Sequence, residues 1–120
     1  MPHPVVHFEI GCKDRAKTCA FYRDLFGWTI NEDDNSPAAM VHTGTDEGIQ
    51  GHITALGHEP HHYTNMYVGC EKLEDTVAKA EKLGGKILVP PTDVPGMGRF
   101  AWIADVEGLQ VGLWEAAETA

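Results

Sequence analysis

The sequence predicts an α+β fold built from two βαβββ modules, and two observations lead to this. The stretch Val5–Ile30 reads as strand, turn, helix, glycine stop and strand. A weaker echo of the same order follows at Asn65–Val89. Self-similarity of this kind indicates one supersecondary unit used twice. At 120 residues we expect a single domain, residues 1–120, with modules at about 5–55 and 64–115.

In the first module, individual residues predict where the helix begins and ends. Asp14 can cap a helix whose last turn is Arg23–Phe26, and Gly27 is a typical helix end. The turn-rich segment 32–37 separates a strand from the rest of the module. The strands expected in this half are Val5–Ile10, Trp28–Asn31, Ala38–Thr43 and Ile49–Ala55.

The second module repeats this order after a short linker, Leu56–His62. A helix is expected at Leu73–Leu83, stopped by Gly84 and Gly85. Pro90 and Pro91 are expected to end the strand that follows, because proline lacks the N–H that a sheet requires. The strands expected in this half are Asn65–Gly69, Lys86–Val89, Phe100–Ala104 and Leu109–Trp114, with a glycine-rich loop at 94–98.

Composition and charge narrow the classes of partner. The formal net charge of −9 argues against nucleic acid and anionic membranes and permits a cationic ligand, although solubility alone is a commoner reason for acidity. No apolar run approaches the roughly 20 residues that span a bilayer, and the first residues do not read as an export signal. The 3 cysteines lack CxxC spacing and fit reduced thiols. We therefore expect a cytoplasmic protein.

Alternation within four strands is the best clue to a functional surface. Each of these strands has an apolar side, which must pack under a helix, and a polar side. The opposite side is either a flat solvated sheet face or, if it curves, the wall of a cleft. Tyr67 and Trp114 on this side favour the cleft. The polar side carries His7 and Glu9, Gln50 and His52, Asn65 and Tyr67, and Gly112 and Trp114 in the four strands.

Four segments carry a resemblance to a known family: HFEI, FYRDLFGWTI, LGGKI and PPTDVPGMGRFAWIADVEGLQVGLWE. Together they resemble the vicinal oxygen chelate superfamily of glyoxalases, bleomycin resistance proteins and extradiol dioxygenases, over Val5–Glu115. The resemblance implies that the two modules form a cupped mixed sheet with helices on its outer face. It also implies a homodimer, often with modules exchanged between chains.

The resemblance further implies where a metal would bind, because metal-using members place ligands on the first, fourth, fifth and eighth strands. The matching positions are His7, then His52 or Gln50, then Asn65, then Gly112. Imidazoles are good ligands, but a carboxamide is poor and glycine has no ligating side chain. We therefore expect no cofactor, or a weakly held divalent metal on His7 and His52. A structural histidine remains the commoner explanation for His7.

Other residues admit two interpretations each. Glu9 could act as a general base if burial raised its pKa, or pair with a histidine. Arg99 could neutralise an anionic ligand or make a surface ion pair. Glu115 has the wrong strand parity for the polar side. Gly112 is expected to leave open space beside the Trp114 indole, where a flat or cationic molecule could stack.

Two function classes remain, with pure association as a third. The first is a small-molecule-binding protein that holds an aromatic or cationic ligand in the cleft. The second is a divalent-metal-dependent lyase or dioxygenase acting on a substrate with vicinal oxygens. The candidate ligand-binding residues are His7, Glu9, Gln50, His52, Asn65, Tyr67, Arg99 and Trp114.

Overall fold

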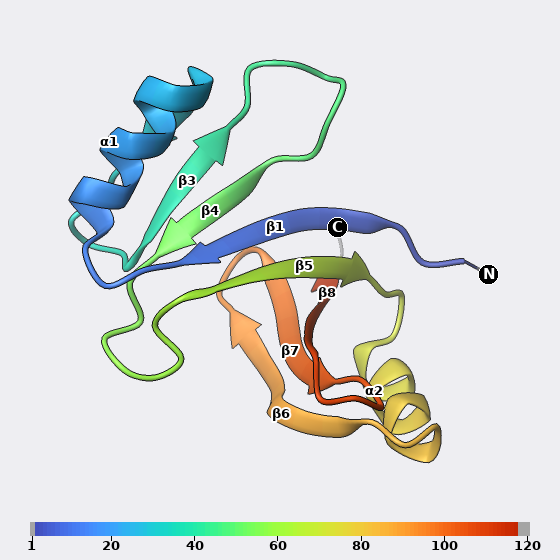
Figure 1. Cartoon of the computed structure of the whole chain (residues 1–120). Coiled ribbons are helices and arrows are strands. Elements are labelled where there is room, and N and C mark those ends of the chain that lie inside the picture. Colours follow the sequence, from blue (N-terminus) through green and yellow to red (C-terminus); the bar gives the residue numbers. More distant parts are fainter. Residues whose placement is uncertain (1, 118–120) are drawn as a thin grey trace. The chain divides into compact units, whose positions relative to one another are not determined.

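The computed structural model describes residues 2–117, and the chain divides into two compact units. We call His7–Asn65 the N-terminal unit, and the chain up to Val6 together with Met66 onward the C-terminal unit. The first module's elements, drawn in blue to green in Figure 1, are β1 (Val5–Gly11), α1 (Arg15–Phe26), β2 (Thr29–Asn31), β3 (Ala38–His42) and β4 (Gly51–Thr54).

The strands of the N-terminal unit lie in the order β2-β3-β4-β1. β1 and β4 are parallel, whereas β3 pairs antiparallel with both β2 and β4. Helix α1 begins as predicted, because the Asp14 carboxylate accepts a hydrogen bond from the Lys17 N–H at 3.0 Å. It ends at Gly27, which adopts a left-handed conformation with φ 71°. The helix covers one face of the sheet, over a core that includes Cys19, Val41 and Ile53.

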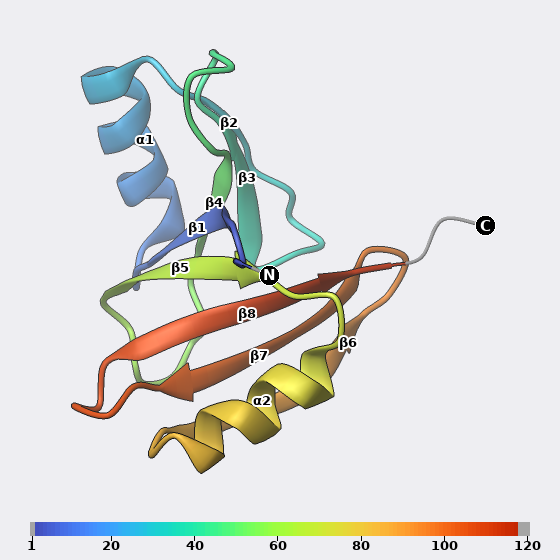
Figure 2. The same ribbon diagram turned by 90° about the vertical axis from the view of Figure 1, so that its right-hand side faces the viewer.

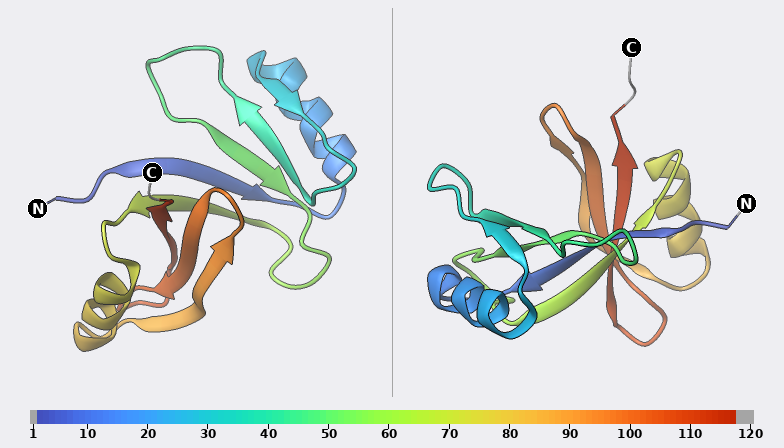
Figure 3. Two further views of the ribbon diagram at one scale, coloured as in Figure 1. Left: turned by 180° about the vertical axis from the view of Figure 1, so that it is seen from behind. Right: turned by 90° about the horizontal axis from the view of Figure 1, so that it is seen from above.

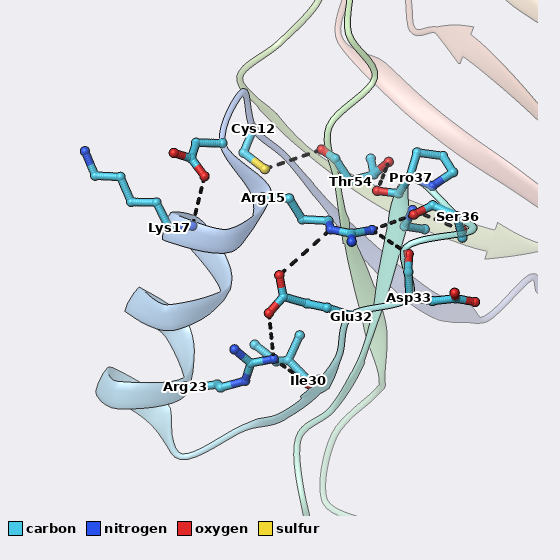
Figure 4. A network of polar contacts seen from close by, with 12 residues as sticks. Cys12, Arg15, Lys17, Arg23, Ile30, Glu32, Asp33, Ser36, Pro37 and Thr54 are labelled. Atoms are coloured by element: carbon cyan, nitrogen blue, oxygen red, sulfur yellow. Dashed lines mark hydrogen bonds and ion pairs between the residues drawn. The ribbon is translucent and has the colours of Figure 1, made fainter.

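Two arginines of α1 form hydrogen bonds with the segment that follows the helix, and both lie on the helix side of the sheet (Figure 4). Arg15 donates to the carbonyls of Asp33 and Ser36. Arg23 donates to the Ile30 carbonyl at 2.6 Å and to the Glu32 carboxylate at 3.1 Å. Both arginines of this unit therefore bind groups in the segment that follows α1.

The second module contains β5 (Tyr63–Gly69), α2 (Leu73–Lys82), β6 (Lys86–Val94), β7 (Gly98–Ala104) and β8 (Gln110–Ala116). Its strand order is β5-β8-β7-β6, with β5 and β8 parallel. This is the order of the first module, so the predicted repeat of a βαβββ unit is confirmed. Helix α2 lies along β6, β7 and β8 (Figures 2 and 3), over a core that includes Leu73, Ala101 and Leu113.

The start of α2 uses a cap that the local sequence does not supply. Lys72 at the cap position makes no capping bond. Instead Glu115 on β8 accepts a hydrogen bond from the Leu73 N–H at 2.9 Å. Glu115 therefore lies on the helix side of its strand, as its parity predicts.

Several strand boundaries differ from the sequence prediction, among them the end of β6 and the start of β5. β6 does not stop at Pro90 and Pro91 but continues to Val94. Proline is tolerated there because β6 is the last strand in its order and its pairing with β7 shifts register twice between Ile87 and Thr92. β5 begins at Tyr63 rather than Asn65, which adds to the sheet a residue that the sequence prediction left between the linker and the strand.

All three cysteines, Cys12, Cys19 and Cys70, are free thiols and are buried. Within residues 2–117, no helix is long and apolar enough to cross a membrane.

Candidate functional site

The face of the N-terminal sheet opposite α1 carries most of the predicted site. On β1, Phe8 and Ile10 pack against the core under α1, which leaves His7 and Glu9 on the other face. In the parallel pairing with β4, Glu9 lies opposite His52. The alternation predicted for these two strands is therefore confirmed, and it places both histidines beside the carboxyl group.

These side chains form a continuous hydrogen-bonded chain. The Tyr63 hydroxyl donates to Glu9 Oε2, and His52 Nε2 lies 3.4 Å from the same oxygen. On the other edge of its ring, His52 Nδ1 lies 2.7 Å from His7 Nε2. A neutral imidazole has one donor and one acceptor. With the His52 proton on Nε2, facing Glu9, its Nδ1 accepts a hydrogen bond from His7.

Burial determines the charge of His7 in this cluster. Glu9 is only 3% exposed, although it is a carboxylic acid. The pKa of His7 is lowered to about 4, mainly by burial and also by the nearby His52, while Glu9 opposes the shift. The His7 imidazole is therefore uncharged at neutral pH. Glu9 pairs with a histidine, one of the two roles that the sequence allows.

Asn65 is a buried polar residue that lacks partners. It is 4% exposed, and neither its amide nitrogen nor its carbonyl oxygen has a hydrogen-bond partner. It lies two residues after Tyr63 on β5, so both side chains project from the same strand face. A buried carboxamide without partners costs about 1–3 kcal/mol, which makes Asn65 a candidate for contact with a ligand.

Gln50 is held away from this cluster. Its carbonyl oxygen accepts a hydrogen bond from the Thr43 N–H, and its amide donates to the Thr45 carbonyl at 3.3 Å. The carboxamide thereby closes the loop between β3 and β4. Of the two fourth-strand candidates, His52 is the one that meets His7.

The residues at the family's metal positions do not make a complete ligand set. His52 directs its two ring nitrogens to different partners, His7 and Glu9, so these three groups do not converge on one point. The eighth-strand position is Gly112, which a tyrosine ring covers. Among residues 2–117, no group of three His, Cys, Asp or Glu side chains is arranged to hold a metal ion. The donors present do not fit a tightly held metal.

In the C-terminal unit, the expected open space beside Trp114 is filled. A Cβ atom on Gly112 would lie 2.5 Å from the Tyr67 ring, so that ring packs directly over the glycine. Tyr67 is buried, and its hydroxyl accepts a hydrogen bond from Trp102 Nε1 at 2.8 Å. The Trp114 ring in turn lies over Gly98, where a Cβ would be 2.9 Å from the indole. The prediction that a ligand slides in beside Gly112 is wrong, because Tyr67 occupies that place.

Of the two roles expected for Arg99, the structure has the ion pair: its guanidinium binds carboxylates of the protein itself. Its guanidinium donates to Glu115 Oε2 from Nε at 3.0 Å and to Glu74 Oε1 from Nη2 at 2.7 Å. The hydrogen bond from Arg99 lowers the pKa of Glu74 to about 2, and the two carboxylates raise the pKa of the arginine. With both carboxylates bound, Arg99 belongs to the α2 cap.

Sequence reasoning missed two residues of the N-terminal face. Tyr63 was assigned to neither the linker nor the strand, although counting back by two from Asn65 would have found it. Met40 lies opposite His52 in the β3–β4 pairing and is 47% exposed. Its signal was the alternation of β3, where Ala39 and Val41 are buried. We call His7, Glu9, Met40, His52, Tyr63 and Asn65 the polar platform.

Comparison with known proteins gives distant relatives. The anthracycline biosynthesis protein DnrV of Streptomyces peucetius is 27% identical over 89% of this chain. CFP32 of Mycobacterium bovis, named as a candidate glyoxylase, is 26% identical over 90% of it. The chain spans 45% and 44% of these relatives, less than half their length.

Solved structures share the fold. Methylmalonyl-CoA epimerase from Mycobacterium tuberculosis superposes with a TM-score of 0.69 at 14% identity, over 95% of this chain and 88% of that one. The hypothetical protein BH1468 from Bacillus halodurans gives 0.71 at 11% identity, over 100% and 99%. The family model described as Glyoxalase/Bleomycin resistance protein/Dioxygenase superfamily matches residues 5–113, and the chain belongs to that superfamily.

Proposed function

We propose that this chain is a small-molecule-binding protein whose ligand contacts the polar platform. The observation that carries the proposal is Asn65, a buried carboxamide with neither polar atom bonded. Natural proteins rarely leave such a group unsatisfied, and a ligand that displaces the groups covering Asn65 can supply its partners. The neighbouring Tyr63–Glu9–His52–His7 chain provides a fixed polar surface, and exposed Met40 provides apolar contact.

The charge of the platform supports an uncharged or cationic ligand. No lysine or arginine is among its residues, and Arg15 and Arg23 of the same unit are bound near α1. His7 is uncharged at neutral pH because its pKa is lowered to about 4. An anion would therefore approach the Glu9 carboxyl group with no lysine or arginine among the platform residues to balance its charge.

The relatives suggest a first probe. DnrV and a second relative, DauV of a Streptomyces strain, are both named as anthracycline biosynthesis proteins. An anthracycline is a flat aromatic molecule with a cationic amino sugar, which matches the aromatic or cationic ligand inferred from the sequence. It is also fluorescent, so binding can be followed directly.

The test is a fluorescence titration of daunorubicin with the chain and with two matched variants. Met40→Ala removes exposed apolar contact from the platform, and we expect about fivefold weaker binding. Met97→Ala is the control, since Met97 is also exposed but lies in the C-terminal unit between β6 and β7. Equal binding by all three proteins would place the ligand elsewhere, and absence of saturable binding to any anthracycline would remove this ligand class.

A metal-dependent lyase or dioxygenase remains the second candidate, and one observation favours it. The imidazoles of His7 and His52 lie on neighbouring strands, and two imidazoles are a common start to a metal site, although a metal would have to replace the 2.7 Å hydrogen bond that joins them. Elemental analysis of protein made without a histidine tag decides this. About one Zn, Ni, Fe or Mn per chain, lost in His7→Ala, would favour the enzyme.

We also propose that the chain forms a homodimer, as the family resemblance implies. The helix α1 leaves Phe21, Leu25 and Phe26 more than half exposed, which is a large apolar surface for one helix. Sedimentation equilibrium tests this, with Leu25→Glu as the variant expected to dissociate the dimer. A monomer at every accessible concentration would end the proposal.

A further inference from the structure

We infer that the ligand presents an uncharged cis-amide edge, such as that of a lactam or imide, and that Asn65 recognises it. The inference rests on the proposed function and names the ligand class for the same platform. Asn65 is the observation that singles out this class, because both halves of its carboxamide lack partners. Every other polar side chain of the platform already has at least one bond or close ionic contact.

The geometry of a carboxamide defines what satisfies it. The side chain presents N–H donors beside a carbonyl acceptor in one plane. A lactam or imide edge presents the complementary pair, an N–H beside a C=O, and forms two parallel hydrogen bonds once the groups that cover the Asn65 carboxamide have moved aside. A simple ketone would satisfy only the Asn65 amide. A carboxylate has acceptors only, and it would leave the Asn65 carbonyl unpaired.

Charge separates the lactam from the remaining alternative. A protonated carboxylic acid also offers a donor beside an acceptor, but carboxylic acids ionise near pH 4. At neutral pH the acid would arrive as an anion beside Glu9, which is 3% exposed. The platform offers that anion no lysine or arginine. The amide edge keeps its N–H without a charge.

The platform also limits size and shape. Met40, His52 and Glu9 lie on three successive strands, β3, β4 and β1, so Met40 and Glu9 are two strand spacings apart. Two spacings are about 10 Å, which is the length of two fused six-membered rings with a substituent. Exposed Met40 can cover an apolar ring, while the amide edge lies toward β5, the strand of Asn65.

A matched pair of probes tests the inference. Quinolin-2(1H)-one carries the N–H beside the C=O, and its N-methyl derivative lacks only the donor. We expect the quinolone to bind about tenfold more tightly, because methylation leaves the Asn65 carbonyl buried and unpaired. We also expect the side-chain NH₂ signals of Asn65, assigned by their absence in Asn65→Leu, to shift with the quinolone in ¹⁵N-correlated NMR spectra.

Two variants complete the test. Asn65→Leu should abolish the preference between the probes, whereas Asn35→Leu, at an exposed asparagine of the turn before β3, should preserve it. Equal affinity of the two probes for the parent, or an unchanged preference in Asn65→Leu, would overturn the inference. Daunorubicin binding that depends on Met40 would still support the proposed function in that case. If neither probe binds while daunorubicin does, the amide edge is wrong and the binding role stands.

Discussion

The Asn65→Leu substitution should stabilise the protein, which is the opposite of what most changes at buried positions do. Asn65 is 4% exposed, and both polar atoms of its side chain lack hydrogen-bond partners. Leucine has the same number of side-chain heavy atoms in the same branching, with two larger methyl groups and no polar atoms, so it removes the unsatisfied group and adds apolar burial. A residue retained at the expense of stability is expected where binding requires it.

The size of the effect follows from two opposing terms. Removing a buried, unsatisfied donor and acceptor gains about 1–3 kcal/mol. A branched side chain in place of a planar one loses up to about 1.5 kcal/mol through imperfect packing. We therefore expect a gain of about 1–2 kcal/mol. For a chain of 120 residues the unfolding entropy is about 0.25 kcal/mol/K, so the melting temperature should rise by roughly 4–8 °C.

Differential scanning calorimetry and urea titration measure this gain independently. The Asn35→Leu protein is the control, because Asn35 is exposed and its replacement should change stability by less than about 0.5 kcal/mol. A loss of more than about 1 kcal/mol in Asn65→Leu would refute the reasoning. Such a loss would mean that the carboxamide is already satisfied in the free protein, and the inference of a ligand edge would lose its support.

Three further predictions concern the groups around the site and the α2 cap. The pKa of His7 is about 4 in the folded protein and about 6.5 in an unfolded chain, so the unfolded chain binds more protons between these pH values. The urea midpoint of unfolding should therefore fall as the pH drops from 6.5 to 4. In His7→Gln this fall should be less steep. Gly112→Ala should lower the free energy of unfolding by about 2 kcal/mol, measured by calorimetry, because the new Cβ would lie 2.5 Å from the Tyr67 ring. Gly48→Ala is the control and should be nearly neutral, because Gly48 has open space around it. Equal effects of the two substitutions would contradict the packing of Tyr67 over Gly112. Glu115→Ala should lower the free energy of unfolding by about 1–2 kcal/mol, because it removes the cap of α2. Glu115→Gln should recover part of this loss, because the glutamine carbonyl can still accept a hydrogen bond from the Leu73 N–H. A Gln variant no more stable than the Ala variant would mean that only the ion pair with Arg99 matters.

The sequence was sufficient for the modules because the signals involved are local. The Asp14 cap, the Gly27 stop and the alternation of His7 with Phe8 depend on neighbours within a turn or a strand, and the structure has all three. The end of β6 was mispredicted because proline's effect depends on whether its strand is an edge, which is a property of the whole sheet.

The site was predicted only in part because side-chain partners come from distant segments. Strand parity located His7, Glu9 and His52, but the link from Glu9 to Tyr63 spans 54 residues. The same limit explains Gly112. A glycine in a strand signals that something approaches closely, and the sequence does not say whether that is a ligand or the ring of Tyr67.

The two modules show how the same backbone was adapted differently at matching positions. In the first, Ile10 pairs with Ile53 in the core; in the second, Val68 pairs with Leu113. These core pairs align the repeats. One residue earlier, the pair Glu9–His52 of the first module then corresponds to the pair Tyr67–Gly112 of the second.

The two corresponding pairs differ in chemistry: Tyr67–Gly112 is a close-packed pair, whereas Glu9–His52 is a polar pair. Tyr67 fills the space over Gly112 and bonds to Trp102, which is the arrangement that stability favours. Glu9 and His52 are a buried acid and a partly buried imidazole, whose desolvation is costly compared with an apolar pair. By the same alignment, Asn65 corresponds to His7. Since the second module packs a ring over a glycine at this level, packing alone does not require polar residues at the matching positions of the first module, as the proposed ligand contact would.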